Sequence, residues 1–335
     1  MKKRILLLVA VLLVSISFVA CQSSDKKTED SKAVVIVNKE SISETEFNDY
    51  VNYQKKVAEI TGYVAPDMWS QEIRDGQTYE SALKESVIEE MVNNLLVLQD
   101  AKKREVLLED SVVKEEMEKY KSTEELQKEF DTQLEKLEIT EDYLKNKILY
   151  PNLLINKYFQ ETVEVTDEEA KNYYDEYSLT FDKVKASHIL VDSEDKARAI
   201  KKKLDEDGNF QELAKEYSTC PSKDKGGDLG YFGRGRMDPA FEKAAFELEI
   251  GEISDVVQSQ FGFHIIKLED KSLTYETNKA DVVSKLRTDK IRTRLDELKN
   301  DSEIEYKITF TKEVQKDEES AETSEKETEE TIEEE

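Results

Sequence analysis

The chain of 335 residues contains two histidines, His188 and His264, and each lies in a short apolar segment with the alternation of a β-strand. In each segment the imidazole falls on the same strand face as aliphatic neighbours, so both rings are predicted to be buried. A buried imidazole needs a hydrogen-bonding partner. We therefore expect the two rings to lie close together and to mark the site of the chemistry.

Cys220 is the third residue whose type could do chemistry, because a thiol beside a histidine can act as a nucleophile. That interpretation would make the protein a cysteine-dependent hydrolase. However, Pro221 follows the cysteine directly, and no glycine-rich turn that could form an oxyanion hole comes after it. The sequence therefore favours a hydrogen-bonding or electrostatic role for this thiol over a nucleophilic one.

The elements that must position these residues form a glycine-rich stretch at 181–271. Its pattern predicts strands at 184–191, 256–257 and 263–268, and helices at 194–206, at 210–217 and from Pro239 onward. A loop is expected from Ser218 to Phe232. Because mainly helical sequence lies on both sides, this stretch is predicted to be a domain inserted into another.

The flanking sequence predicts a helical domain, split into residues 33–180 and 272–312. Ser43 and Glu46 have the spacing of a capping box, as do Thr166 and Glu169. Strands are expected at 33–37 and 304–311, and helices at 79–104, 111–130, 140–161, 167–177 and 281–300. One of these helices carries an apolar stripe: Val87, Met91, Val92, Leu95, Leu96 and Leu98. The stripe is most simply the core of a helix bundle, and a groove for unfolded clients is the alternative.

The N-terminus has the composition of a secretory signal peptide at residues 1–20, with basic residues, an apolar run from Ile5 to Val14 and small residues after it. An uncleaved signal anchor is the alternative, although the run is short for a membrane span of roughly 20 residues. Phe18-Val-Ala-Cys21 resembles the bacterial lipobox, and departs from it at Phe18, where an aliphatic residue is usual. Cys21 is thus predicted to carry lipid on a polar tether, residues 21–32, which leaves Cys220 no disulfide partner.

The formal net charge of −27 argues against nucleic acid as a partner, since binding to phosphates needs a basic surface. It also opposes flat adsorption to an anionic membrane, so the lipid must supply the attachment. Residues 313–335 are almost entirely acidic and polar, and we expect them to form a solvated, disordered tail.

A family resemblance rests on ordered motifs between residues 181 and 271. They include Ala-Ser-His-Ile-Leu-Val, Gly-Gly-Asp-Leu-Gly-Tyr-Phe, Pro-Ala-Phe-Glu, Gly-Glu-Ile-Ser and Gly-Phe-His-Ile-Ile. In this order and spacing the stretch resembles the parvulin prolyl isomerases. The helical flanks, the lipobox and the inserted arrangement resemble the PrsA-type foldase lipoproteins of Gram-positive bacteria. The resemblance implies an α+β fold: a split helical chaperone domain with an inserted, mostly antiparallel small sheet surrounded by helices.

The resemblance also implies the site. The residues expected to bind substrate are Leu229, Met237 and Phe241 as a cup for the proline ring, with Phe232 nearby and Gln260 on the substrate backbone. His188, Cys220 and His264 would form the polar floor. Ordinary core packing is the alternative for the Met and Phe side chains. Because rotation about an X–Pro bond breaks no bond, neither a metal nor a cofactor is expected.

The implied function is a foldase, anchored by lipid to the extracytoplasmic face of the membrane, that isomerises X–Pro bonds in unfolded or newly exported polypeptides. The short acidic loop at 192–195 would repel a phosphoserine, so non-phosphorylated substrates are expected. A holdase chaperone in which the parvulin unit is only a structural or docking module is the alternative. The sequence leaves open whether the chain forms a homodimer.

Overall fold

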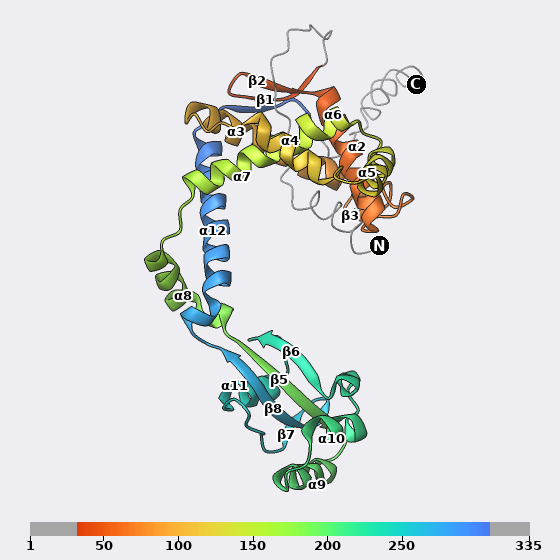
Figure 1. The fold of residues 1–335 in the computed structure, drawn as a ribbon, viewed down its shortest axis with the longest axis vertical. Coiled ribbons are helices and arrows are strands. Elements are labelled where there is room, and N and C mark those ends of the chain that lie inside the picture. The colour runs from red at the N-terminus through yellow and green to blue at the C-terminus, as the bar shows by residue number, and fades with distance from the viewer. Residues whose placement is uncertain (1–31, 309–335) are drawn as a thin grey trace, which may run out of the picture. The chain divides into compact units, whose positions relative to one another are not determined.

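The computed structural model describes residues 32–308, which form two compact units (Figure 1). The first contains the described residues up to Glu161 and from Arg294 onward, and the second runs from Thr162 to Thr293. The predicted signal peptide, the lipid site at Cys21, the tether up to residue 31 and the acidic tail lie outside the described residues. Residues 32–308 contain no helix that combines the length and the apolar composition of a membrane span.

The first unit has a three-stranded antiparallel sheet in the order β2-β1-β9. Its strands are β1 (Ala33–Val37), β2 (Glu40–Ser43) and β9 (Ile304–Tyr306). The strand prediction at 33–37 is confirmed, and the final strand begins at Ile304 as predicted. Because β9 pairs with β1, sequence from both flanks of the second unit contributes to one sheet.

The helices of the first unit follow the sheet. They are α2 (Glu44–Thr61), α3 (Tyr79–Lys103), α4 (Asp110–Lys119), α5 (Glu124–Leu137), α6 (Glu141–Tyr143), a π-helical turn (Leu144–Leu149) and α7 (Tyr150–Thr162), with a hairpin of β3 (Glu72–Arg74) and β4 (Gln77–Thr78) before α3. Both predicted capping boxes are present. The single helix expected at 111–130 is wrong: it is two helices, because Thr123 caps α5 by accepting from the Leu126 N–H.

The apolar stripe of α3 belongs to the core, as the bundle interpretation predicts, except that Leu98 is only half-buried. Val87, Met91 and Leu96 are among its buried side chains. A polar contact fixes the end of this helix: Asp100 Oδ2 accepts from Arg294 Nη2 at 2.8 Å and from the Tyr158 hydroxyl at 2.6 Å. Burial alone would raise the pKa of Asp100, but hydrogen bonds from Tyr158 and the two arginines Arg294 and Arg104 outweigh it and lower that pKa to about 2. The carboxylate thus stays charged and joins α3, α7 and the end of α12 (Tyr275–Asn300).

The second unit is built on a four-stranded antiparallel sheet in the order β6-β5-β8-β7 (Figure 1). Its elements are α8 (Asp167–Phe181), β5 (Lys183–Val191), α9 (Glu194–Asp205), α10 (Phe210–Tyr217), a 3₁₀ helix (Pro221–Lys225), β6 (Asp228–Gly233), α11 (Pro239–Glu247), β7 (Val257–Ser259) and β8 (Gly262–Ser272). The α+β fold class and the antiparallel sheet are therefore as expected.

The sheet of the second unit separates two apolar clusters. Val184, Ala186 and Ile266 pack with α11 on one face, whereas Ile189 and Ile265 pack with α9 and α10 on the other. Alternation along the strands causes this division. By the same alternation both histidines lie on the face that α11 covers, where the ring of Phe241 contacts them.

One stretch of the second unit differs from the prediction. The loop expected at 218–232 instead contains the 3₁₀ helix and most of β6. Gly226, Gly227 and Gly230 have positive φ there, a conformation that favours glycine. These glycines interrupt the alternation of apolar and polar residues that would predict a strand. The unit also extends past 181–271, because Tyr174 and Phe181 of α8 pack with Val282 of α12. The domain boundaries at 181 and 271 stay a prediction.

Candidate functional site

The two histidines lie on adjacent antiparallel strands and contact each other. His188 on β5 is opposite Ile266, and His264 on β8 is opposite Leu190, so the two rings are diagonal neighbours on one face. Their Nδ1 atoms are 3.2 Å apart, and the rings lie at a centroid distance of 5.3 Å. Only 5% of His188 and 4% of His264 is exposed. The prediction that both rings are buried within hydrogen-bond reach is confirmed.

Ser259, at the end of β7, continues this hydrogen-bonded chain. Its Oγ lies 2.7 Å from His264 Nε2 and accepts from the Phe261 N–H at 3.0 Å. Sequence reasoning missed Ser259, and the only signal was its place just before the turn into the second histidine strand. At the other end, His188 Nε2 is buried without a hydrogen-bond partner among residues 32–308. The chain of polar groups thus runs from Ser259 through His264 and ends at His188.

Both imidazoles are neutral at pH 7. Burial lowers the pKa of His188 to about 4, and the neighbouring His264 adds to this decrease. Burial also lowers the pKa of His264, and the carboxylate of Asp238 opposes the shift. The pair therefore presents uncharged polar groups to its surroundings, which is the opposite of an ionised acid–base dyad.

An aromatic and aliphatic cluster covers the histidine pair. The ring of Phe241 lies 5.6 Å from that of His188 and 5.1 Å from that of His264, edge to face in both cases. Phe232 lies 6.0 Å from Phe241 and is buried beside it. Leu229 and Met237 are only half-buried and pack against the same cluster. The four apolar residues predicted from the resemblance are thus brought together in one cluster, which contacts the histidines through Phe241.

Leu229, Phe232 and Met237 also line an open cavity of about 910 Å³, whose lining does not include the other predicted site residues: His188, Cys220, Phe241, Gln260 and His264. The half-buried side chains thus face a space that a ligand can enter, whereas Phe241 belongs to the buried layer beneath. A small apolar ring is the kind of group that this wall can cover without leaving polar atoms unpaired.

Cys220 and Gln260 occupy less central positions. Cys220 is half-buried at the start of the 3₁₀ helix with a free thiol, and its backbone N–H donates to Ser218 Oγ at 3.3 Å. Within the described residues its sulfur forms no hydrogen bond to either histidine. Gln260 is exposed in the turn between β7 and β8. The roles expected for these two residues stay predictions.

A glycine holds the Cys220 segment against the histidine strand. The His188 N–H donates to the Gly227 carbonyl at 3.0 Å. Gly227 has a φ of +88°, and a Cβ there would meet the His188 carbonyl oxygen at 2.4 Å. Only glycine fits this close approach of two backbones.

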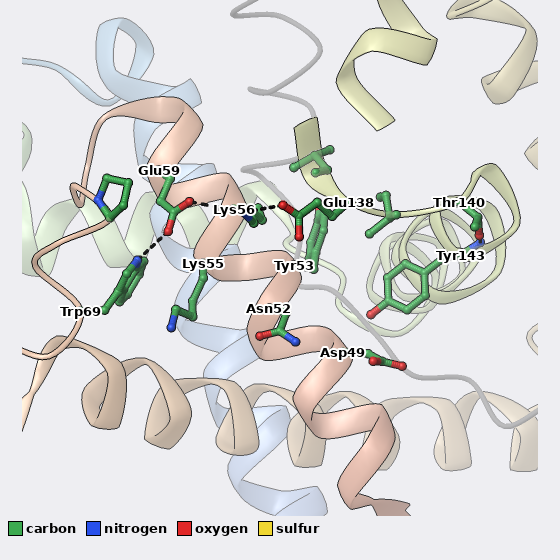
Figure 2. A pocket seen from close by; sticks show the side chains of 13 residues that line it. Asp49, Asn52, Tyr53, Lys55, Lys56, Glu59, Trp69, Glu138, Thr140 and Tyr143 are labelled. Carbon is green, nitrogen blue, oxygen red and sulfur yellow. Dashed lines mark hydrogen bonds and ion pairs between the residues drawn. The ribbon is translucent and has the colours of Figure 1, made fainter. Parts of the chain in front are cut away.

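A second candidate site lies in the first unit, in a cleft of about 630 Å³ along α2 (Figure 2). Trp69 Nε1 donates to Glu59 at 2.8 Å, and Lys56 forms an ion pair with Glu138 at 2.6 Å, so a hydrogen bond and an ion pair fix the two walls. Tyr143 lines the same cleft. Aromatic rings beside paired charges form a surface that suits varied polypeptide side chains.

Comparison with known proteins agrees with this division of the chain. Residues 1–159 match the family described as a SurA-like N-terminal domain, and residues 161–272 match the family described as a PPIC-type PPIASE domain.

Whole-length relatives carry the name foldase protein PrsA. The chain is 36% identical to that of Caldanaerobacter subterraneus subsp. tengcongensis over 311 residues, which cover 91% of this chain and 96% of the relative. It is 33% identical to that of Halalkalibacterium halodurans, with coverage of 90% and 83%. A crystal structure of a peptidylprolyl isomerase (PrsA) from Bacillus cereus matches at 31% identity over 82% of this chain and 91% of that chain, with a TM-score of 0.33.

Proposed function

The chain belongs to the PrsA foldase family and carries a parvulin-type peptidyl-prolyl isomerase domain, and from this premise we propose that it is a lipid-anchored foldase of newly exported proteins. The observation that supports the proposal best is the neutral histidine pair in contact with Phe241, which packs in one apolar cluster with the cavity-lining residues Leu229, Phe232 and Met237. Clients would be unfolded polypeptides outside the cytoplasm.

The chemistry of the reaction explains why such a site needs no charged catalyst. The X–Pro amide rotates over a barrier of ~18–20 kcal/mol because of its partial double bond. In the twisted state the amide has lost resonance, and its carbonyl is less polar than in the planar state. An apolar, uncharged environment therefore favours the twisted amide over the planar one.

We assign the roles accordingly. Leu229, Met237 and Phe241 form the cup for the proline ring, with Phe241 as its buried base and Phe232 supporting the wall. His188 and His264 fix the floor as neutral hydrogen-bonding groups and transfer no proton. Cys220 adds a polar group at its edge, and Gln260 contacts the substrate backbone from the turn.

The role of Cys220 is tested by replacing it. Cys220→Asp keeps a polar group and removes the thiol, so we expect it to retain substantial isomerase activity in a protease-coupled peptide assay. His264→Ala, which leaves its partners unpaired, should lower activity or destabilise the unit. Complete loss of activity in Cys220→Asp would favour a thiolate mechanism instead.

Attachment to the membrane depends on Cys21 in this proposal. A diacylglyceryl group there, at ~0.8 kcal/mol per buried methylene, would hold the chain on the extracytoplasmic face. Cys21→Ser should therefore release the protein into the medium, as cell fractionation would show. A variant that stays in the membrane fraction would indicate an uncleaved signal anchor.

The holdase alternative gives the cleft along α2 the main role and leaves the parvulin unit as a docking module. A deletion variant that lacks residues 181–271 separates the two functions. We expect it to lose peptide isomerisation and to keep suppression of client aggregation. If the intact chain shows no isomerase activity while suppressing aggregation, the holdase interpretation replaces the foldase one.

A further inference from the structure

Cations gather beside the apolar wall of the isomerase unit. The cavity that contains Leu229, Phe232 and Met237 is also lined by Lys183, Arg234 and Arg236, and no carboxylate of the described part of the chain lines it. This contrasts with the net charge of −27 of the whole chain. We define these three cations and three apolar residues together as the basic groove.

The two arginines are held in a fixed turn after β6. Gly235 between them has a φ of +73°, and its N–H donates to Glu242 Oε2 at 2.6 Å. The Arg234 guanidinium lies 4.0 Å from the centre of the Phe246 ring and 3.8 Å from Asp182. The turn therefore restricts the two arginines to a narrow range of positions beside the groove.

Of the three cations, Arg236 is the most available to bind a ligand. It is exposed, and among residues 32–308 it forms neither an ion pair nor a hydrogen bond. Lys183, by comparison, is paired with Asp281, and Arg234 with Asp182. Arg236 directly precedes Met237 of the apolar wall, so their Cα atoms are about 3.8 Å apart. Arg234 is at most about 11 Å from Met237 on the same reasoning.

The opposite end of β5 carries the opposite charge. Lys183 begins the strand, and the acidic loop Asp192–Asp195 follows its last residue, Val191. A strand of this length extends over about 30 Å, with His188 in its interior. In this loop Asp192 is paired with Lys196 and Glu194 with Arg198, so among residues 32–308 the loop carboxylate without an ion pair is that of Asp195. A client laid along β5 would therefore meet Arg236 on one side of its proline and this carboxylate on the other.

We propose that the isomerase unit prefers prolines with a Glu or Asp one to three residues away on one side only. This inference rests on the proposed function and names the substrate class of the same site. The carboxylate would pair with Arg236 and Arg234 while the proline ring lies against Leu229 and Met237. The acidic loop would disfavour a carboxylate on the other side.

The experiment uses the full chain and short peptides of the form Ala-Ala-Pro-Ala-Ala, with Glu or Lys replacing one Ala before or after the proline. Exchange NMR gives the cis/trans rate, and titration in the same spectra gives the affinity. For Glu at one of the two positions, we expect the cis/trans rate and the affinity to be about threefold to fivefold higher than for the neutral peptide, as exposed charge pairs allow. The peptide with Lys at that position should have a lower rate and affinity than the neutral peptide. About 0.5 M salt should remove the differences between the three peptides.

Variants connect the preference to the groove. Arg236→Gln should bring the Glu-to-neutral ratio close to one, whereas Arg236→Lys should retain most of it. Lys119→Gln, which removes an exposed cation paired with Glu116 on α4 of the first unit, is the charge-matched control and should leave the ratio unchanged. Equal rates and affinities for both Glu peptides and the neutral one would overturn the inference while leaving the proposed function intact. Absence of exchange with every peptide would overturn the proposed function, and the affinity ratios would still decide the inference.

Discussion

The Nδ1 atoms of His188 and His264 lie 3.2 Å apart, although the residues are 76 positions apart in the chain. At this distance one nitrogen must donate and the other accept, so the pair shares a single proton. If both rings were charged, both nitrogens would carry protons and the hydrogen bond would be lost. The geometry of the floor is therefore tied to the neutral state of the pair.

Acid should destabilise the isomerase unit through this pair. The pKa of His188 is about 4 in the folded chain, below the ordinary value of 6.5. Between these values the unfolded chain binds a proton that the folded ring does not, so the unfolding free energy falls as the pH falls. The contribution of His188 to the unfolding free energy is on the order of 3 kcal/mol. It is fully present above pH 6.5 and is lost by about pH 4.

Proton NMR can test this directly, because the chain contains two histidines and their ring resonances are easily assigned. Both rings should titrate below 6.5. Denaturant unfolding at about pH 7 and about pH 5 gives the matching change in stability. A ring that titrates at its ordinary value would contradict the buried, neutral pair.

Ser259 should stabilise the histidine pair although it touches only one ring. Ser259→Ala removes the partner of His264 Nε2 and the acceptor of the Phe261 N–H. An unsatisfied buried polar group costs about 1–3 kcal/mol, so we expect a loss of that size in unfolding free energy. Ser259→Thr keeps the hydroxyl and should stay near the parent protein. Equal stability of the alanine and threonine variants would mean that this contact contributes nothing.

The sequence predicted contacts that follow from local rules and missed those that depend on tertiary pairing. Strand alternation and the scarcity of histidine led to the His188–His264 contact, and spacing alone led to the capping boxes. Ser259 was missed because it faces His264 only through the β7–β8 hairpin. Strand β6 was missed because its glycines hide the alternation. No local pattern could connect Asp100 with Arg294, which lies 194 residues later.

That distant pair should be among the strongest polar contributions to the first unit. Asp100→Asn removes the charge that holds Arg294 and the Tyr158 hydroxyl, and the Asp100 side chain is only 12% exposed. We expect a loss of about 2–3 kcal/mol in unfolding free energy. The matched control is Glu297→Gln, since Glu297 binds the same arginine at 2.9 Å but is 54% exposed. It should cost less than about 1 kcal/mol, and equal effects of the two variants would contradict the importance of burial here.

Gly227 should tolerate no side chain, and a second glycine shows why. Gly227→Ala and Gly251→Ala both place alanine at a φ of +88°, so both incur the strain of a left-handed backbone, about 1–2 kcal/mol. Only at Gly227 does the added Cβ meet another atom, the His188 carbonyl oxygen at 2.4 Å, whereas nothing lies within 4 Å at Gly251. We therefore expect Gly227→Ala to lose at least about 2 kcal/mol more than Gly251→Ala in denaturant unfolding, and to shift the histidine ring resonances. Equal losses would show that the segment carrying Cys220 moves away from His188 at little cost.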